Sequence, residues 1–292
     1  MNTRLRLPDY LKTSIASLDN AEYKKVKKIL LENNLNTVCN EARCPNKCKC
    51  YSSLTATFMI LGKNCTRNCA FCNVCGDKPA VVDINEPEHI ADAVNKLGLK
   101  YCVITSVTRD DLYQDNDFGS VHYFNVIDKL RHCCPDVKIE VLTPDFCGNK
   151  IALDRIVEAK PDVFNHNIET IARLYPVARQ MANFTRSLDV LRYMKEKNFI
   201  TKSGFMLGLG EDISEIHDLI HILDDIKLDI VTVGQYIQPS KKHLNVSKYY
   251  TEQEFKDLEE YIKNNTSIYP VCAPLARSSY QAFETYMKIT HC

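Results

Sequence analysis

The stretch Thr57-Phe-Met-Ile-Leu61, followed closely by Cys65-Thr-Arg-Asn-Cys69-Ala-Phe-Cys72, decides the fold of this chain. The first part is a short apolar run, which is typical of a buried strand. The second part places three cysteines in the loop directly after that strand. Catalytic residues of parallel α/β barrels gather at the carboxyl ends of the strands. The sequence therefore predicts a functional loop at the end of the first strand.

Beyond this loop, short apolar runs alternate with amphipathic stretches. The candidate strands are Thr57–Leu61, Tyr101–Thr105, Lys138–Leu142, Asp162–Asn165, Thr201–Leu207 and Asp229–Val233. The stretches between them have apolar residues at helical spacing. The apolar sets are Ile90/Val94/Leu97, Ile151/Ile156/Val157, Leu188/Leu191/Met194 and Ile216/Leu219/Ile220/Leu223. Two more helices are expected over Glu22–Leu31 and Glu252–Ile262. Strands that alternate with helices in this way indicate parallel βαβ units.

Six such units suit an α/β fold of the partial (β/α)6 barrel type, because a closed barrel usually needs eight. A flat doubly wound sheet is the alternative that the same pattern allows. Residues 1–56 form a polar, cysteine-bearing N-terminal extension ahead of the barrel, which we place at residues 57–265.

The composition excludes several classes of function. Lys plus Arg and Asp plus Glu both number 37, so the net charge is zero and indicates neither a nucleic acid nor a membrane surface as partner. No apolar run approaches the ~18–20 residues of a membrane span. The first twenty residues lack the apolar core of a secretory signal. We expect a cytoplasmic protein.

Cysteine is unusually abundant, with 14 residues in a chain of 292. Eight of these cysteines lie between residues 39 and 75. A secreted disulfide scaffold would need a signal peptide and is usually shorter. The clustered cysteines therefore indicate metal binding or redox chemistry.

The triplet Cys65, Cys69 and Cys72 can wrap one loop around a four-iron cluster. Three thiolates leave one iron without a protein ligand, and a substrate or cofactor can bind there. The alternatives are a structural zinc site or an electron-transfer cluster, to which Cys75 could supply a fourth thiolate. A zinc site usually has two CxxC-like pairs, and this triplet does not divide that way.

A second triplet, Cys39, Cys44 and Cys50, indicates another cluster, whose last ligand comes from elsewhere in the chain. Cys48 could replace Cys50 as the third ligand, or all four thiols could bind zinc. The other cysteines have no ligand spacing and are interpreted mostly as small buried hydrophobic residues. They are Cys102, Cys133, Cys134, Cys147, Cys272 and Cys292.

The C-x3-C-x2-C spacing, with Phe71 before the last cysteine, resembles the radical S-adenosylmethionine superfamily. In that superfamily the open iron binds the methionine moiety, and one electron splits the sulfonium to give a 5′-deoxyadenosyl radical. The two triplets together resemble the lipoyl synthase family. Further matching segments are Leu99–Leu112, Pro144–Phe146, Pro161–Thr170, Thr201–Glu211, Gly234–Ser240 and Arg277–Tyr280, so the resemblance runs over nearly the whole chain.

The resemblance implies a role for each triplet. Cys65, Cys69 and Cys72 would hold the [4Fe-4S] cluster that cleaves S-adenosylmethionine. Cys39, Cys44 and Cys50 would hold an auxiliary [4Fe-4S] cluster that donates sulfur. The fourth ligand of that cluster would be Ser279, with Ser278 as the alternative, in a C-terminal segment (266–292) that folds back over the barrel mouth.

The resemblance also implies contacts with S-adenosylmethionine. Phe71 belongs to the cluster loop, and Gly208 and Glu211 belong to the glycine-bearing strand that lies near the adenine. Asn165 and Glu169 could bind ribose hydroxyls, and Arg186 could pair with the methionine carboxylate. A helix-capping or salt-bridge role for Asn165, Glu169 and Arg186 is the alternative.

The implied reaction inserts sulfur at the sixth and eighth carbons of an octanoyl chain on a lysine of a lipoyl carrier domain, with two S-adenosylmethionine molecules used per lipoyl group. The carriers would be the glycine cleavage H-protein and 2-oxoacid dehydrogenase acyltransferase subunits, and flavodoxin or ferredoxin would be the reductant. Three alternatives stay open. They are a biotin-synthase-like sulfur-inserting enzyme, a ferredoxin-like electron carrier and a zinc-stabilised binding module.

Overall fold

The computed structural model describes residues 5–12, 20–53 and 56–291. Parts of the predicted N-terminal extension, and Cys292, lie outside these ranges. In the described part, seven strands follow one another in the sheet in chain order, and the pairings β1–β2, β2–β3, β5–β6 and β6–β7 are parallel. The strands are β1 (Thr57–Ile60), β2 (Tyr101–Ser106), β3 (Lys138–Leu142), β4 (Val163–Asn165), β5 (Ile200–Leu207), β6 (Ile230–Gln235) and β7 (Tyr269–Cys272).

This strand order distinguishes the two folds that the sequence allowed. A doubly wound sheet reverses its strand order at a switch point, whereas a barrel-type sheet adds each strand next to its predecessor. The order β1 to β7 has no reversal, so the doubly wound alternative is wrong. The six predicted strands are confirmed to within two residues at each end. The seventh strand, β7, was not predicted.

The chain divides into two compact units. The first unit comprises Met1–Lys12, Asn68–Cys72 and Phe164–Cys292, and the second comprises Thr13–Arg67 and Asn73–Val163. The second unit contains strands β1 to β3 and helices α1 (Ala21–Glu32), α2 (Val38–Glu41), α3 (Lys47–Ser52), α4 (Glu86–Leu97), α5 (Ser120–Cys133) and α6 (Lys150–Ala159). The three-part division at residues 56 and 265 stays a prediction.

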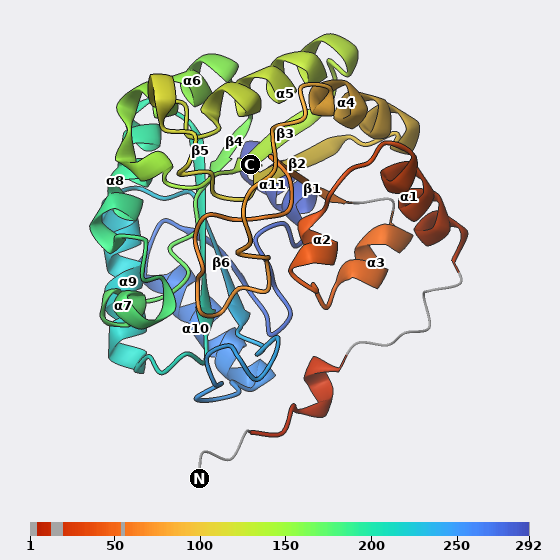
Figure 1. Ribbon diagram of the computed structural model, residues 1–292. Helices are drawn as coiled ribbons and strands as arrows, with labels where there is room; N and C mark the ends of the chain where they lie inside the picture. Colours follow the sequence, from red (N-terminus) through yellow and green to blue (C-terminus); the bar gives the residue numbers. More distant parts are fainter. Residues whose placement is uncertain (1–4, 13–19, 54–55, 292) are drawn as a thin grey trace. The chain divides into compact units, whose positions relative to one another are not determined.

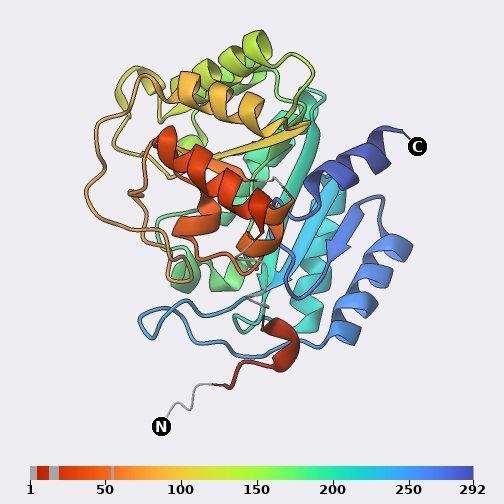
Figure 2. The ribbon, with the colours of Figure 1, turned by 90° about the vertical axis from the view of Figure 1, so that its right-hand side faces the viewer.

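Within the second unit, α4, α5 and α6 stand side by side over the strands (Figures 1 and 2). Their apolar faces supply a core that includes Ile90, Val126 and Ile156, none of which is exposed. Helix α1 begins where the Asn20 side chain accepts the Glu22 amide at 2.7 Å, and it packs on α3. The N-terminal helices therefore belong to the same packed body as the strand that precedes the cysteine loop.

The first unit contains β5, β6 and β7 with helices α7 (Tyr175–Ala178), α8 (Phe184–Glu196), α9 (Ile213–Asp225), α10 (Glu252–Asn265) and α11 (Ala282–Thr290). Figure 1 shows α8 and α9 along the same side of β5 and β6. Helices α9 and α10 each begin with a capping box, which satisfies two of the amides that a helix N-terminus leaves unpaired. No helix in the described ranges is long and apolar enough to cross a membrane.

Candidate active site

The loop that carries Cys65 starts at a sharp turn after β1. Leu61 has a φ of 68°, a conformation that L-residues with side chains adopt rarely. The buried Glu86 carboxylate accepts the Leu61 amide at 2.9 Å, and Arg109 Nη1 donates to the Leu61 carbonyl at 3.3 Å. His122 Nε2 lies 2.7 Å from the same Glu86 oxygen. Charged side chains therefore hold the turn on both sides of Leu61.

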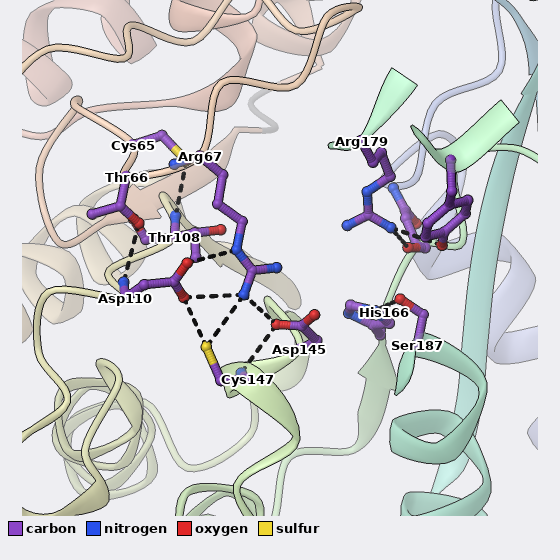
Figure 3. Close-up of polar contacts among 12 residues, drawn as sticks. Cys65, Thr66, Arg67, Thr108, Asp110, Asp145, Cys147, His166, Arg179 and Ser187 are labelled. Atoms are coloured by element: carbon purple, nitrogen blue, oxygen red, sulfur yellow. Dashed lines mark hydrogen bonds and ion pairs between the residues drawn. The ribbon is translucent and has the colours of Figure 1, made fainter. Parts of the chain in front are cut away.

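The Cys65 thiol lies among backbone donors. Its Sγ accepts the amides of Arg67 and Thr108, each at 3.4 Å, as Figure 3 shows in part. Amide donors directed at sulfur stabilise a thiolate and are a typical environment of iron–sulfur cluster ligands. Cys75, the possible fourth thiolate, is exposed, and its carbonyl accepts the Cys65 amide at 2.7 Å. The environment of Cys65 therefore fits a cluster ligand.

Cys69 and Cys72 belong to the first unit, where the backbone between them forms hydrogen bonds with two other segments. The Ala70 amide donates to the Ala178 carbonyl at 2.9 Å, and its carbonyl accepts the Leu244 amide at 3.0 Å. The His243 Nε2 donates to the Cys72 carbonyl at 2.9 Å. Sequence analysis missed His243, because a single histidine in a polar loop has no spacing that marks it.

The second triplet lies on and between two short helices, with Cys39 in α2 and Cys50 in α3. Burial raises the pKa of the Cys39 thiol to about 12, and the nearby thiols of Cys44 and Cys50 add to this shift. Burial, followed by Cys44, raises the pKa of Cys50 to about 11. The Cys44 thiol thus contributes to the raised pKa of both Cys39 and Cys50. Cys48 is not among the groups that shift the pKa of Cys50.

In the structure, these thiols are not arranged as metal-binding sites. Across the described residues, no group of three or more His, Cys, Asp and Glu side chains is arranged to hold a metal ion. The cluster ligands inferred from the two triplets therefore stay predictions.

Two residues predicted to contact S-adenosylmethionine, Asn165 and Glu169, lie at the end of β4 and shortly after it, in the first unit. Asn165 ends β4 and is fully buried. Glu169 has a φ of 68°, and its amide and carbonyl bond to Gly204 and Met206 of β5, both at 2.9 Å. Burial raises the pKa of Glu169, and Arg179 and Asn167 oppose the shift. A backbone strained in this way is common at ligand-binding sites.

Arg179, which sequence analysis missed, is the cation beside Glu169. Its Nη1 donates to the Asn167 carbonyl and to the Tyr175 hydroxyl, both at 3.0 Å. Burial alone would lower the pKa of Arg179, but Tyr175, Glu169 and the Cys69 thiol outweigh it and raise the pKa. Its Nε is buried and has no hydrogen-bond partner among the described residues. One buried donor beside Cys69 is thus available to a ligand.

The remaining predicted residues have visible structural roles. Arg186 is half-buried in the first turn of α8, where its amide donates to the Asn183 side chain at 2.9 Å. The Glu211 carboxylate accepts the amides of Gly208 and Leu209, which closes the turn after β5. A Cβ at Gly208 would lie 2.5 Å from the Lys248 carbonyl, so only glycine fits there. Phe71 is half-buried. Their contacts with a cofactor stay predictions.

Comparison with known proteins identifies the family. Residues 59–223 match the model of the radical SAM superfamily, and residues 1–44 match the N-terminal domain of lipoyl synthase of the radical SAM family. The chain is 47% identical to the lipoyl synthase of Caldicellulosiruptor saccharolyticus over 95% of its length and 96% of that protein. It is 49% identical to the lipoyl synthase of Aquifex aeolicus over 90% of its length and 95% of that protein. This chain belongs to the lipoyl synthase family.

Solved structures agree with this membership at the level of the fold. Streptococcus suis SuiB bound to S-adenosylmethionine aligns with a TM-score of 0.58 at 14% identity, covering 77% of this chain and 54% of SuiB. Methylornithine synthase aligns with a TM-score of 0.57 at 14% identity, covering 72% of this chain and 62% of that one. The fold is thus the predicted partial barrel, and membership of the family makes the chain a radical SAM enzyme and implies S-adenosylmethionine and iron–sulfur chemistry.

Proposed function

We propose that this chain inserts two sulfur atoms, at the sixth and eighth carbons, into an octanoyl group carried on a protein lysine. The observation that carries the proposal is the second cysteine triplet. A radical SAM barrel needs only one cluster to cleave S-adenosylmethionine, yet the sequence has a second triplet, of which Cys39 and Cys44 lie within residues 1–44 that match the N-terminal domain of lipoyl synthase and Cys50 follows shortly after. A second cluster in that place would serve as the sulfur donor.

Two separate [4Fe-4S] clusters follow from this reading, with Cys65, Cys69 and Cys72 binding one and Cys39, Cys44 and Cys50 the other. When bound, the clusters and S-adenosylmethionine supply a carbon radical that removes hydrogen from unactivated C–H bonds, and sulfide that replaces it. Cys50 is the third auxiliary ligand in this proposal because of the C-x4-C-x5-C spacing of the triplet, and Cys48 is the alternative.

Ser279 is proposed as the fourth auxiliary ligand. The neighbouring Ser278 is already engaged, because its hydroxyl accepts a hydrogen bond from Asn167 Nδ2 at 2.7 Å. Ser278 and Ser279 lie at the centre of a turn in which the Tyr280 amide donates to the Arg277 carbonyl at 2.7 Å, and this leaves Ser279 as the serine proposed to face the cluster. A hydroxyl oxygen binds the iron of a cluster more weakly than a thiolate does. A weak ligand of this kind suits a cluster that must give up its sulfur.

The polar groups after β4 are proposed to hold S-adenosylmethionine. The buried Nε of Arg179 is a donor for the methionine carboxylate, a role that the sequence had given to Arg186. The Asn167 Oδ1 is also buried and has no partner among the described residues, so it can accept a hydrogen bond from the ligand. Glu169 and Asn165 remain the proposed partners of the ribose. Orphaned buried polar groups of this kind are expected at a ligand site.

The proposed substrate is the octanoyl-lysine of a lipoyl carrier domain, either the glycine cleavage H-protein or a 2-oxoacid dehydrogenase acyltransferase subunit. The reaction would use two S-adenosylmethionine molecules per lipoyl group and electrons from flavodoxin or ferredoxin, in the cytoplasm. The residues that line the site must exclude water and other hydrogen donors, because a primary carbon radical attacks almost any C–H bond.

The test is anaerobic incubation of the reconstituted protein with S-adenosylmethionine, a reductant and an octanoyl-lysyl peptide, followed by mass spectrometry. We expect a peptide that has gained two sulfur atoms and two equivalents of 5′-deoxyadenosine. Ala in place of Cys39 should leave 5′-deoxyadenosine formation intact and remove the thiolated product, whereas Ala in place of Cys65 should remove both. Thiolation of dethiobiotin in place of the peptide would support the biotin-synthase-like alternative and contradict the proposal.

A further inference from the structure

Arg67, inside the first cysteine motif, is the centre of a buried ion network (Figure 3). Its side chain is 3% exposed. Its Nε and Nη2 form a fork on the two oxygens of Asp110, at 2.7 and 3.0 Å. The same Nη2 donates to Asp145 Oδ1 at 2.6 Å and approaches Cys147 Sγ at 3.5 Å. One guanidinium thus binds two carboxylates, and Asp145 is fully buried.

This arrangement is specific to arginine. The planar fork of a guanidinium binds a carboxylate through two parallel bonds and still has donors for a second carboxylate. A lysine keeps the charge but cannot form the fork. Removing the cation would leave the fully buried Asp145 carboxylate without the guanidinium that it binds, which is strongly destabilising. Burying these charges costs desolvation free energy, so the network indicates a function or a structural need.

The network connects directly to the Cys65 thiol. The Arg67 amide donates to Cys65 Sγ, and the second donor is the Thr108 amide, both at 3.4 Å. Thr66 joins the two segments, because its amide and hydroxyl both donate to the Thr108 carbonyl at 3.0 Å. The Asp110 amide in turn donates to the Thr66 hydroxyl at 3.1 Å. Asp110, which lies in the segment that supplies the second amide, therefore binds both the Arg67 side chain and the Thr66 hydroxyl of the cysteine loop.

We propose that Arg67 is a positioning residue which, through Asp110 and Asp145, fixes two amide N–H groups on the Cys65 sulfur and so sets the reduction potential of the cluster that Cys65 binds. The inference rests on the proposed function, in which Cys65 is a cluster ligand. Amide dipoles directed at a cluster sulfur favour the reduced state, because that state carries one more negative charge. Loss of the alignment should therefore lower the potential.

The first experiment compares Arg67→Lys and Thr66→Val with the wild type. Thr66→Val removes the hydroxyl between the two segments and leaves every charge in place. EPR-monitored redox titration of the reconstituted proteins should show a lower midpoint potential in both variants. A tenfold loss in the equilibrium constant for reduction corresponds to a fall of about 59 mV for this one-electron couple. Arg131→Lys, which alters an Arg–Asp162 pair elsewhere in the second unit, should leave the potential unchanged.

A second measurement needs no cluster. Hydrogen–deuterium exchange of the apoprotein should show faster exchange of residues 65–67 and 108–110 in Arg67→Lys and Thr66→Val, and wild-type exchange there in Arg131→Lys. Unchanged potentials and unchanged exchange in both variants would overturn the inference. If Arg67→Lys does not fold, the Thr66→Val data decide alone. If the Cys65→Ala variant binds as much iron as the wild type, Cys65 is not a cluster ligand. The proposed function then fails, which is a separate outcome.

Discussion

The side-chain amide of Asn167 joins two segments that lie 111 residues apart in the chain. Its Nδ2 donates to the Ser278 hydroxyl at 2.7 Å and to Glu169 Oε1 at 3.0 Å. Glu169 is a proposed S-adenosylmethionine contact, and Ser278 adjoins the proposed auxiliary ligand Ser279. One side-chain amide within the first unit thus orients both a proposed S-adenosylmethionine contact and the residue next to a proposed cluster ligand.

Asn167→Ala should impair both functions at once. Two partly buried hydrogen bonds are lost, at a cost of about 1–3 kcal/mol in the free energy of unfolding. The affinity for S-adenosylmethionine should fall about tenfold or more, which equilibrium dialysis can measure. Asn265→Ala is the matched control, because Asn265 makes one exposed bond to the Tyr261 carbonyl. Wild-type affinity in Asn167→Ala would contradict the assignment.

Ser279→Cys should convert a labile auxiliary cluster into a persistent one. A thiolate binds iron more tightly than a hydroxyl oxygen, so less sulfide should reach the product while 5′-deoxyadenosine still forms. The measurement is sulfide loss during a single turnover, set against product by mass spectrometry. Ser278→Cys is the matched control. A greater effect of the Ser278 variant would show that the ligand had been misplaced by one position.

Cys48 and Cys50 should differ in their contribution to iron binding. Cys50→Ala should remove the iron of one four-iron cluster, because the spacing of the triplet makes Cys50 a proposed ligand of the auxiliary cluster. Cys48→Ala should keep its iron and change the free energy of unfolding by about 0.5 kcal/mol or less. Iron and sulfide analysis of both variants provides the test, and the reverse pattern would reassign the third ligand to Cys48.

The stability of the apoprotein should fall at high pH because of Cys39. The folded-state pKa of Cys39 is about 12, against an ordinary value of 9.0. A raised pKa stabilises the fold below pH 9.0, and this contribution is lost as the pH rises towards 12. The slope should be about 1.4 kcal/mol per pH unit for this group. Urea unfolding of wild type and Cys39→Val between pH 8 and 11 should give a flatter profile for the variant. Equal slopes would rule out this source.

Much of the fold could be predicted, because each central strand is a short apolar run between amphipathic helices. Strand β3 has the predicted bounds, and α1 and α10 were found to within a few residues. Strand β7 was missed because it is a sheet edge that contains Pro270, and proline is tolerated where no further strand needs its amide. Helix α11 was missed because it follows a polar turn without a clear start signal.

The site was predictable where spacing carries the information. Both cysteine triplets are regular local patterns, although their assembly into cluster sites stays a prediction. Arg179, Asn167 and His243 carry no such pattern, because each acts on residues that are distant in the sequence or on backbone groups. Arg186 was chosen from charge alone, although the half-buried cation beside Glu169 proved to be Arg179.

The bonding of the segment 68–72 constrains when iron can enter a newly made chain. This segment is tied to Ala178, His243 and Leu244, which the ribosome adds more than 100 residues later. Until residue 244 has left the exit tunnel, the segment that carries Cys69 and Cys72 cannot form all of these hydrogen bonds. Cys65 and its neighbours, by contrast, need nothing beyond residue 147 for their contacts. If the first motif binds a cluster as proposed, we therefore expect iron delivery to it to follow synthesis of most of the protein.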